Sequence, residues 1–160
     1  WRYGGLRTQL APTSGAMGYG VPAAVAASLI EPNRAVLCLA GDGDFLMNGQ
    51  ELATAAQYGA TPLIVVFNNN MYGTIRMHQE REYPGNEIGT ELKNPDFVAL
   101  AQAYGGHGIR VNTTEQFDDA LAGSLKAINK QKMFALIELT VDPEMITPGM
   151  SMSQIRAAAS

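Results

Sequence analysis

The sequence predicts a doubly wound α/β domain, in which a parallel β-sheet carries helices on both of its faces. Short, uninterrupted apolar runs alternate along the chain with segments rich in helix-forming residues, the pattern of strands joined by crossover helices. Strands that are buried on both faces in a parallel sheet have such continuous apolar runs. The length of 160 residues fits a single domain with a substantial core.

The first half of the chain predicts two helices and two strands. Residues 21–30 are helix formers, with Pro22 acceptable in the first turn. The apolar run 35–40, which ends at Gly41, predicts a central strand buried on both faces. Residues 49–58 predict a helix that stops at Gly59, and the β-branched run 62–67 predicts a second central strand.

The second half continues this alternation. A helix is expected at 73–82 and another at 95–104, the latter with Asn94 as its N-cap. A short strand at 109–111 precedes a helix that starts at Thr114, with apolar residues on one face. The run 134–141 predicts a last strand, and the tail beyond Pro143 is weakly specified. The predicted strands are thus at 35–40, 62–67, 109–111 and 134–141.

Bulk composition excludes several classes of function. The chain is 46% hydrophobic and 16% charged, as in ordinary globular proteins. A net charge of −4 without a basic cluster argues against binding to nucleic acid or an anionic membrane. The single cysteine, Cys38, excludes an internal disulfide and is expected to be a small buried hydrophobe. These properties suit a cytoplasmic protein, and the start at Trp1, without Met, suggests a fragment of a longer chain.

The chemistry concentrates at two predicted strand ends. The first strand is followed by Gly41-Asp42-Gly43-Asp44 and the second by Asn68-Asn69. In parallel α/β sheets, ligands bind at the carboxyl ends of strands. The two glycines allow close approach of a ligand, and the amides of Gly43 and Asp44 are expected to face an anion. Asp42 and Asn69 offer the oxygen ligands that Mg²⁺ takes together with phosphates.

Other nucleotide-binding motifs do not fit. Leu46 stands where the third glycine of a dinucleotide-binding fingerprint would be, and no Gly-Lys-Ser/Thr of a P-loop occurs. Taken alone, each strand end could also be an ordinary turn, because Asp-Gly and Asn tracts are common there.

Together, the two segments resemble the motif of thiamine diphosphate (ThDP) enzymes, in which Gly-Asp-Gly and an Asn pair are separated by a helix and a strand. The resemblance extends from Ser14-Gly15-Ala16-Met17-Gly18 through Gly49-Gln50-Glu51-Leu52 to Asn94-Pro95-Asp96-Phe97. The chain is similar to the C-terminal, diphosphate-binding domain of the group that includes acetolactate synthase, benzoylformate decarboxylase and pyruvate decarboxylase.

The resemblance implies roles for particular residues. Asp42, Asn69 and the backbone carbonyl of Met71 are the implied Mg²⁺ ligands, and Gly41, Gly43 and Asp44 belong to the cofactor-binding loop. Met17 corresponds to the apolar residue that holds ThDP bent, and the carbonyl of Gly15 accepts a hydrogen bond from the aminopyrimidine. Met17 as simple core filler is the alternative.

Three positions depart from the family pattern or stay open. Acetolactate synthases have a Trp on the helix after the Asn pair, where this chain has His78. His78 is therefore either a substrate contact with different chemistry or an exposed helix residue. Asp44 replaces a common Ser, so its carboxylate has to point away from a diphosphate. His107 is expected on the surface, in a turn before a strand.

The resemblance implies that 1–160 is the ThDP- and Mg²⁺-binding domain of an acetolactate synthase-like enzyme that decarboxylates or carboligates a 2-oxo acid. The alternatives are a ThDP-dependent lyase or decarboxylase with a non-pyruvate substrate, and a non-catalytic cofactor-binding assembly module. The family's activating glutamate lies in a separate pyrimidine-binding domain, and nothing in this chain matches it. A homo-oligomer acting on a small 2-oxo acid or aldehyde is expected, and the domain alone is expected to be inactive.

Overall fold

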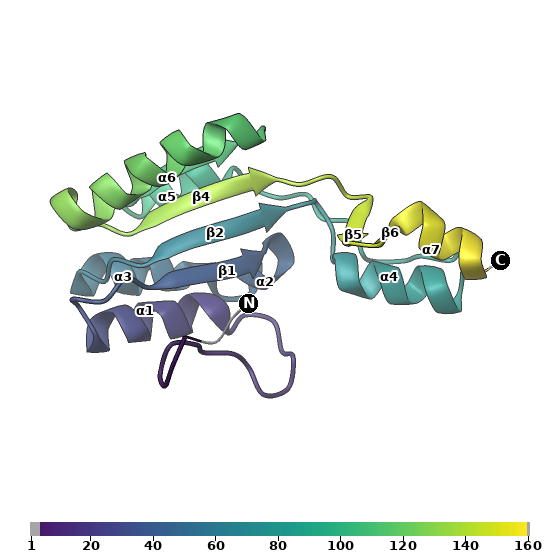
Figure 1. Ribbon diagram of the computed structural model, residues 1–160, viewed down its shortest axis with the longest axis horizontal. Coiled ribbons are helices and arrows are strands. Elements are labelled where there is room, and N and C mark those ends of the chain that lie inside the picture. Colours follow the sequence, from purple (N-terminus) through teal and green to yellow (C-terminus); the bar gives the residue numbers. More distant parts are fainter. Residues whose placement is uncertain (1–3, 160) are drawn as a thin grey trace.

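The computed structural model describes residues 4–159 and contains a four-stranded parallel sheet with the strand order β1-β2-β4-β3 (Figure 1). The strands are β1 (Leu37–Gly41), β2 (Leu63–Asn68), β3 (His107–Val111) and β4 (Ala135–Thr140). The helices that connect or flank them are α1 (Gly20–Ile30), α2 (Asp42–Asn48), η1 (Gly49–Glu51), α3 (Leu52–Tyr58), α4 (Gly73–Glu82), α5 (Phe97–Ala103), η2 (Thr114–Gln116), α6 (Phe117–Lys126) and the π-helical turn η3 (Ala127–Gln131). The predicted α/β fold class is confirmed.

Helices lie on both faces of the sheet because the chain reverses its direction across it. The connections from β1 to β2 and from β2 to β3 move across the sheet toward the β3 edge, whereas the connection from β3 to β4 moves back toward β1. Since parallel crossovers are right-handed, the return connection α6 lies on the opposite face from α3 and α5. The core is accordingly split into two clusters. One includes Val25, Phe45 and Phe97 from α1, α2 and α5, and the other includes Ala120 of α6 with Val65 of β2.

The first strand differs from the prediction. The run 35–40 was expected to be buried on both faces, but β1 lies at an edge of the sheet and its residues alternate between exposed and buried. Leu37 and Leu39 are 50% and 55% exposed, because α6 does not extend over β1. By contrast, β2 lies between β1 and β4, and the four residues from Leu63 to Val66 are buried.

The tail, which the sequence specifies only weakly, forms regular secondary structure. Beyond Pro143 the chain forms an antiparallel pair, β5 (Met145–Thr147) with β6 (Met150–Ser151), and then helix α7 (Met152–Ala159). Figure 1 shows that α4, this hairpin and α7 lie together beyond the carboxyl ends of the strands. Met152 and Ile155 of α7 are buried, so an apolar face of this helix packs against the rest of the domain.

Among residues 4–159, no helix has the length and apolar character needed to cross a membrane.

Candidate functional site

The candidate site is a cavity of about 590 Å³ at the carboxyl edge of the sheet. Three chain segments form its walls: the loop before α1, the junction of β1 with α2, and the start of α4. Its lining residues are Gly15, Ala16, Met17, Gly41, Asp42, Gly43, Asp44, Met71, Tyr72, Gly73, Thr74 and Ile75. The predicted cofactor residues are therefore brought to one cavity, with the exception of Asn69, which is half-buried outside this lining.

Asp42 is a buried carboxylate, 2% exposed, at the first position of α2. Its Oδ1 accepts the Gly43 N–H at 2.9 Å, and its Oδ2 accepts the Asn94 side-chain amide at 2.7 Å. Both donors are neutral, and no ion pair involving Asp42 occurs within the described part of the chain. A buried carboxylate without a cationic partner is costly, so the site chemically fits a metal ion at this position.

Glycine is required at position 43 because the ring of Tyr72, from the segment after β2, packs against it. A Cβ at this position would lie 2.4 Å from Cε1 of Tyr72, a separation that no side chain can adopt. The Tyr72 ring therefore packs directly on the backbone of the first turn of α2. The Gly43 amide already donates to Asp42, so a diphosphate contact through that amide would have to share this hydrogen bond.

The segment after β2 is held in place by hydrogen bonds. Asn69 Oδ1 accepts the Met71 N–H at 3.2 Å, and Asn70 has a left-handed backbone with φ of 57°. The Tyr72 N–H donates to the Thr90 carbonyl, and the Leu92 N–H donates to the Asn70 carbonyl, each at 2.8 Å. The Met71 carbonyl accepts the Gly73 N–H at 3.0 Å. Asn69 and Met71, the metal ligands that the resemblance implies, thus belong to a hydrogen-bonded turn, and Met71 lines the same cavity as Asp42.

The loop that carries Gly15 and Met17 is fastened to α2 at Gly18. Asp44 Oδ1 accepts the Gly18 N–H at 2.6 Å, and Asn48 Nδ2 donates to the Gly18 carbonyl at 2.8 Å. Gly18 has φ of 89°, and a Cβ there would lie 2.8 Å from both Asn48 and Met47. The Asp44 carboxylate is therefore turned toward this loop.

Met17 is 43% exposed and lines the cavity. It is therefore a surface residue of the cavity rather than core filler. Cys38, in contrast, is buried, and burial together with the nearby Asp44 charge raises the pKa of its thiol to about 12. The thiol is thus protonated at neutral pH, as expected for a small hydrophobe.

The two histidines lie outside the cavity. Thr74 and Ile75, in the first turn of α4, line it, whereas His78 is exposed one turn further along, with its Nδ1 2.9 Å from Nη2 of Arg81. His107 was expected on the surface before a strand. Instead it is the first residue of β3 and half-buried, with a buried Nε2 beside Gly123.

Asn94 is a site residue that the sequence analysis assigned wrongly. It was expected to cap the helix at 95–104, but that helix begins at Phe97 and Asp96 is its N-cap, accepting the Ala99 N–H at 3.0 Å. The Asn94 side chain instead reaches Asp42. Asn and Asp are equally good N-caps, so the sequence Asn94-Pro95-Asp96 is ambiguous without the tertiary contact.

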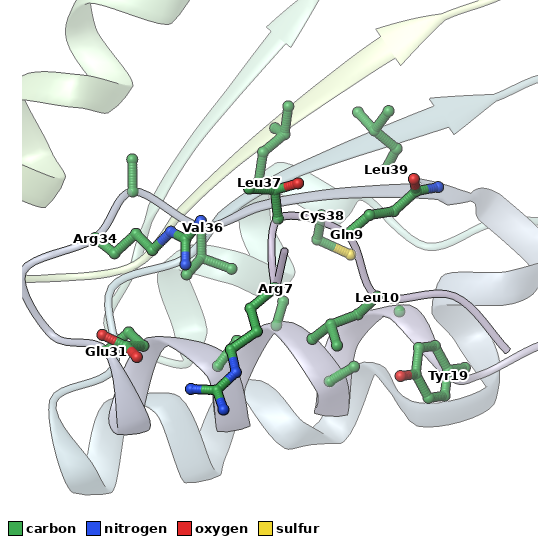
Figure 2. A pocket seen from close by; sticks show the side chains of 16 residues that line it. Arg7, Gln9, Leu10, Tyr19, Glu31, Arg34, Val36, Leu37, Cys38 and Leu39 are labelled. Atoms are coloured by element: carbon green, nitrogen blue, oxygen red, sulfur yellow. The ribbon is translucent and has the colours of Figure 1, made fainter. Parts of the chain in front are cut away.

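A second cavity, of about 430 Å³, lies between α1, β1 and the segment that includes Arg7 and Leu10 (Figure 2). Figure 2 shows Cys38 pointing from β1 toward α1, whereas Leu37 and Leu39 point away from that helix. None of the polar residues at the strand ends lines this cavity. It is therefore separate from the candidate site.

Comparisons with known proteins agree with this geometry. Residues 1–139 match the family described as "Thiamine pyrophosphate enzyme, C-terminal TPP binding domain". The chain is 36% identical over 130 residues to the acetolactate synthase large subunit of Haemophilus influenzae, covering 81% of this chain and 22% of that protein. It is 36% identical over 129 residues to the acetolactate synthase isozyme 3 large subunit of Escherichia coli, covering 80% of this chain and 22% of that protein.

Solved structures agree as well. The thiamine diphosphate-dependent 4-hydroxybenzoylformate decarboxylase of Rhodococcus jostii superposes with a TM-score of 0.75 at 37% identity, over 82% of this chain and 24% of that one. Benzoylformate decarboxylase of Polynucleobacter necessarius gives a TM-score of 0.75 at 32% identity, over 84% of this chain and 25% of that one. The chain thus spans about a quarter of the length of the relatives that it matches. With its strand-end loops, its cavity and these matches taken together, the chain belongs to the family of C-terminal thiamine pyrophosphate-binding domains of thiamine pyrophosphate enzymes.

Proposed function

We propose that this domain binds ThDP through Mg²⁺ in a larger enzyme that decarboxylates or carboligates a 2-oxo acid. The observation that carries the proposal is Asp42, a buried carboxylate without a cationic partner among residues 4–159, at the wall of a cavity formed by the two strand ends. Mg²⁺ prefers such oxygen ligands together with phosphate oxygens.

Each part of the cavity has a task in this proposal. Asp42, the Asn69 side-chain oxygen and the Met71 carbonyl would hold Mg²⁺, while the loop of Gly41, Gly43 and Asp44 would lie against the diphosphate. ThDP, once bound, supplies the carbon nucleophile and the electron sink. The domain orients it and provides charge.

The loop before α1 would set the cofactor's conformation. Met17, exposed into the cavity, would support the bend between the two rings, and the Gly15 carbonyl would accept a hydrogen bond from the aminopyrimidine. Asp44 and Asn48 hold Gly18, so both tasks depend on the attachment of this loop to α2.

The substrate is proposed at the class level only. The names of the relatives include both acetolactate synthases and benzoylformate decarboxylases, and His78 replaces the Trp expected in the former. An aromatic 2-oxo acid is therefore the second candidate. The consumption of pyruvate and of benzoylformate by the full-length protein, with ThDP and Mg²⁺, decides between them; consumption of neither would remove both.

His78 as a substrate contact is a further proposal, although it lies one turn beyond the cavity-lining Thr74 and Ile75. A His78→Ala variant that keeps the parent's KM for every substrate would exclude this contact. We also propose that residues 1–160 are one part of a longer, oligomeric protein whose pyrimidine-binding domain completes the site.

The metal assignment is tested by Asp42→Ala in the full-length protein. The variant should stay folded but lose Mg²⁺-dependent ThDP binding, because removing a charged metal ligand costs several kcal/mol. Binding is followed by titrating Mg²⁺ at fixed ThDP, with circular dichroism as the folding control. Asp118→Ala, at an exposed position of α6, is the matched control. An unchanged Mg²⁺ dependence in Asp42→Ala would refute the assignment.

A further inference from the structure

Asn94 lies between the two strand ends of the proposed metal site. Its side-chain Nδ2 is 2.7 Å from Asp42 Oδ2, 2.8 Å from Asn68 Oδ1 and 3.4 Å from Asn70 Oδ1. A primary amide has two N–H donors, and the two short contacts use both of them. Asn94 therefore links the residue after β1 to the last residue of β2.

The orientation of this amide is determined by its neighbours. If the Asn94 side chain were flipped, its oxygen would face Asp42 Oδ2 and Asn68 Oδ1, and none of these three acceptors would have a hydrogen to share. In the observed orientation the Asn94 Oδ1 is buried without a hydrogen-bond partner. The hydrogen bonds from Asn94 to the charged Asp42 carboxylate and to the Asn68 amide oxygen therefore stabilise this orientation by more than the unsatisfied Asn94 oxygen costs.

A hydrogen-bonded chain extends from Asn94 across the sheet. Asn68 Nδ2 donates to Glu138 Oε1 at 2.8 Å, and Glu138 Oε2 accepts Arg110 Nε at 2.9 Å. Glu138, on β4, is 3% exposed and lies in register with Arg110 of β3. Arg110 also donates to Asp96, the N-cap of α5, at 3.0 Å.

This chain of contacts closes on itself. The series of hydrogen bonds begins at Asn94 and ends at Asp96, which are two residues apart in the sequence. The loop that carries Asn94 is therefore anchored at both of these residues. The contacts connect positions at the ends of β1 and β2 with β4 and β3. A side chain supported in this way has little freedom to rotate, as is required of a group that orients a metal ligand.

We propose that Asn94 is a positioning residue, which fixes the Asp42 carboxylate in the orientation that binds the divalent cation. This inference rests on the proposed Mg²⁺ site and adds to it a residue that does not itself touch the metal. Asp42 keeps one hydrogen bond on each oxygen, and a carboxylate has about four lone-pair sites. The remaining lone pairs are thereby directed to the cation.

The test uses Asn94→Ala and Asn94→Leu in the full-length protein. Leu has the same number and branching of side-chain heavy atoms but no donors, so it separates the lost hydrogen bonds from a lost contact surface. Apparent Mg²⁺ affinity should fall about 10- to 100-fold in both variants, the usual effect of removing a group that supports a metal ligand. Asn86→Ala, at an exposed loop position, should leave it unchanged.

A spectroscopic readout distinguishes positioning from general stability. With Mn²⁺ in place of Mg²⁺, the zero-field splitting in the electron paramagnetic resonance spectrum should change in Asn94→Leu but not in Asn86→Ala. Wild-type affinity and an unaltered Mn²⁺ spectrum in both Asn94 variants would overturn the role of Asn94. If wild-type protein itself shows no Mg²⁺-dependent ThDP binding, the proposed function fails instead, so the two failures are distinguishable.

Discussion

At the scale of single residues, Asp44 holds the loop before α1 in place through a hydrogen bond to Gly18. Its carboxylate accepts the Gly18 N–H, and a carboxylate turned toward a diphosphate would be repelled by it. Gly18 in turn has a backbone conformation and a packing environment that exclude a Cβ. The position of the loop with Gly15 and Met17 thus depends on a hydrogen bond between two residues 26 positions apart.

Asp44→Ala should loosen this loop. Amide exchange at Gly18 should become about 10- to 100-fold faster, because a hydrogen bond to a charged group contributes about 1.5–3 kcal/mol. Hydrogen–deuterium exchange of the segment 15–18 measures this change. Asp44→Asn keeps an acceptor oxygen without the charge and should have a smaller effect.

Asp118→Ala serves as the control because Asp118 is also acidic and in the first turn of its helix. It removes a helix-dipole interaction of about 0.3–1 kcal/mol and no contact with the loop. Equal exchange at Gly18 in Asp44→Ala and wild type would contradict the role of Asp44.

At the scale of elements, α7 is attached to α4 by a cluster of ion pairs around the buried Glu80. Glu80 of α4 is fully buried and pairs with Arg156 of α7, whose Nε donates to Glu80 Oε2 at 2.7 Å. Arg76 Nε donates to Glu80 Oε1 at 2.9 Å, and Arg76 also binds Glu87. Because α4 begins at the cavity wall with Thr74 and Ile75, the position of α7 supports one side of the candidate site.

The hydrogen bond from Arg156, followed by that from Arg76, lowers the pKa of Glu80 from 4.5 to about 2 despite the opposing effect of burial. A carboxyl whose pKa is lower in the folded state contributes stability that is fully present above its unfolded pKa. This contribution is therefore present above about pH 4.5 and is lost as the pH falls toward about 2.

Glu80→Gln should weaken the docking of α7 on α4 by about 2 kcal/mol at pH 7. The opening free energy of α7, obtained from its amide exchange, is the measurement. The difference in this free energy between wild type and variant should be smaller at pH 3 than at pH 7. Glu82→Gln is the matched control, because Glu82 forms an exposed pair with Arg81, a type of pair that contributes about 0–1 kcal/mol. A difference between Glu80→Gln and wild type that does not depend on pH would contradict the ionic origin.

At the scale of the whole molecule, the domain has its candidate site at the carboxyl edge of the sheet. The chain covers about a quarter of its relatives' length, and Met17 and Ile75, which line the cavity, are each 43% exposed. Leu37 and Leu39 are also exposed along β1. These features suit a domain that works with further parts of a protein.

The 160-residue domain on its own should therefore not consume pyruvate or benzoylformate, even with saturating ThDP and Mg²⁺. The physical reason is that no carboxyl group in the chain is expected to activate the aminopyrimidine ring. A coupled assay for released CO₂ is the measurement, and the full-length protein under the same conditions is the positive control. Measurable turnover by the domain would contradict the idea that the site is shared with another domain.

Local sequence was sufficient to predict the parallel sheet and helices α1 and α4, whereas α2 and α7 lie outside the predicted helices. These features depend on residues that are close together in the chain: the spacing of apolar residues, helix stops such as Gly59 and glycines at turns. They can therefore be predicted without knowledge of the fold. Asp42 and Asn69 could be paired because both follow strands, and the ends of parallel strands meet at one edge of the sheet.

The tertiary structure alone decided which partners these residues have. Asn94 bonds to Asp42 across 52 positions, and Glu80 to Arg156 across 76, and no local pattern encodes such contacts. The edge position of β1 could not be predicted from the sequence either, because a continuous apolar run does not show whether a helix covers each face of the strand. Sequence by itself determined which groups have the required chemistry, whereas the packing of distant segments determined how each group is oriented.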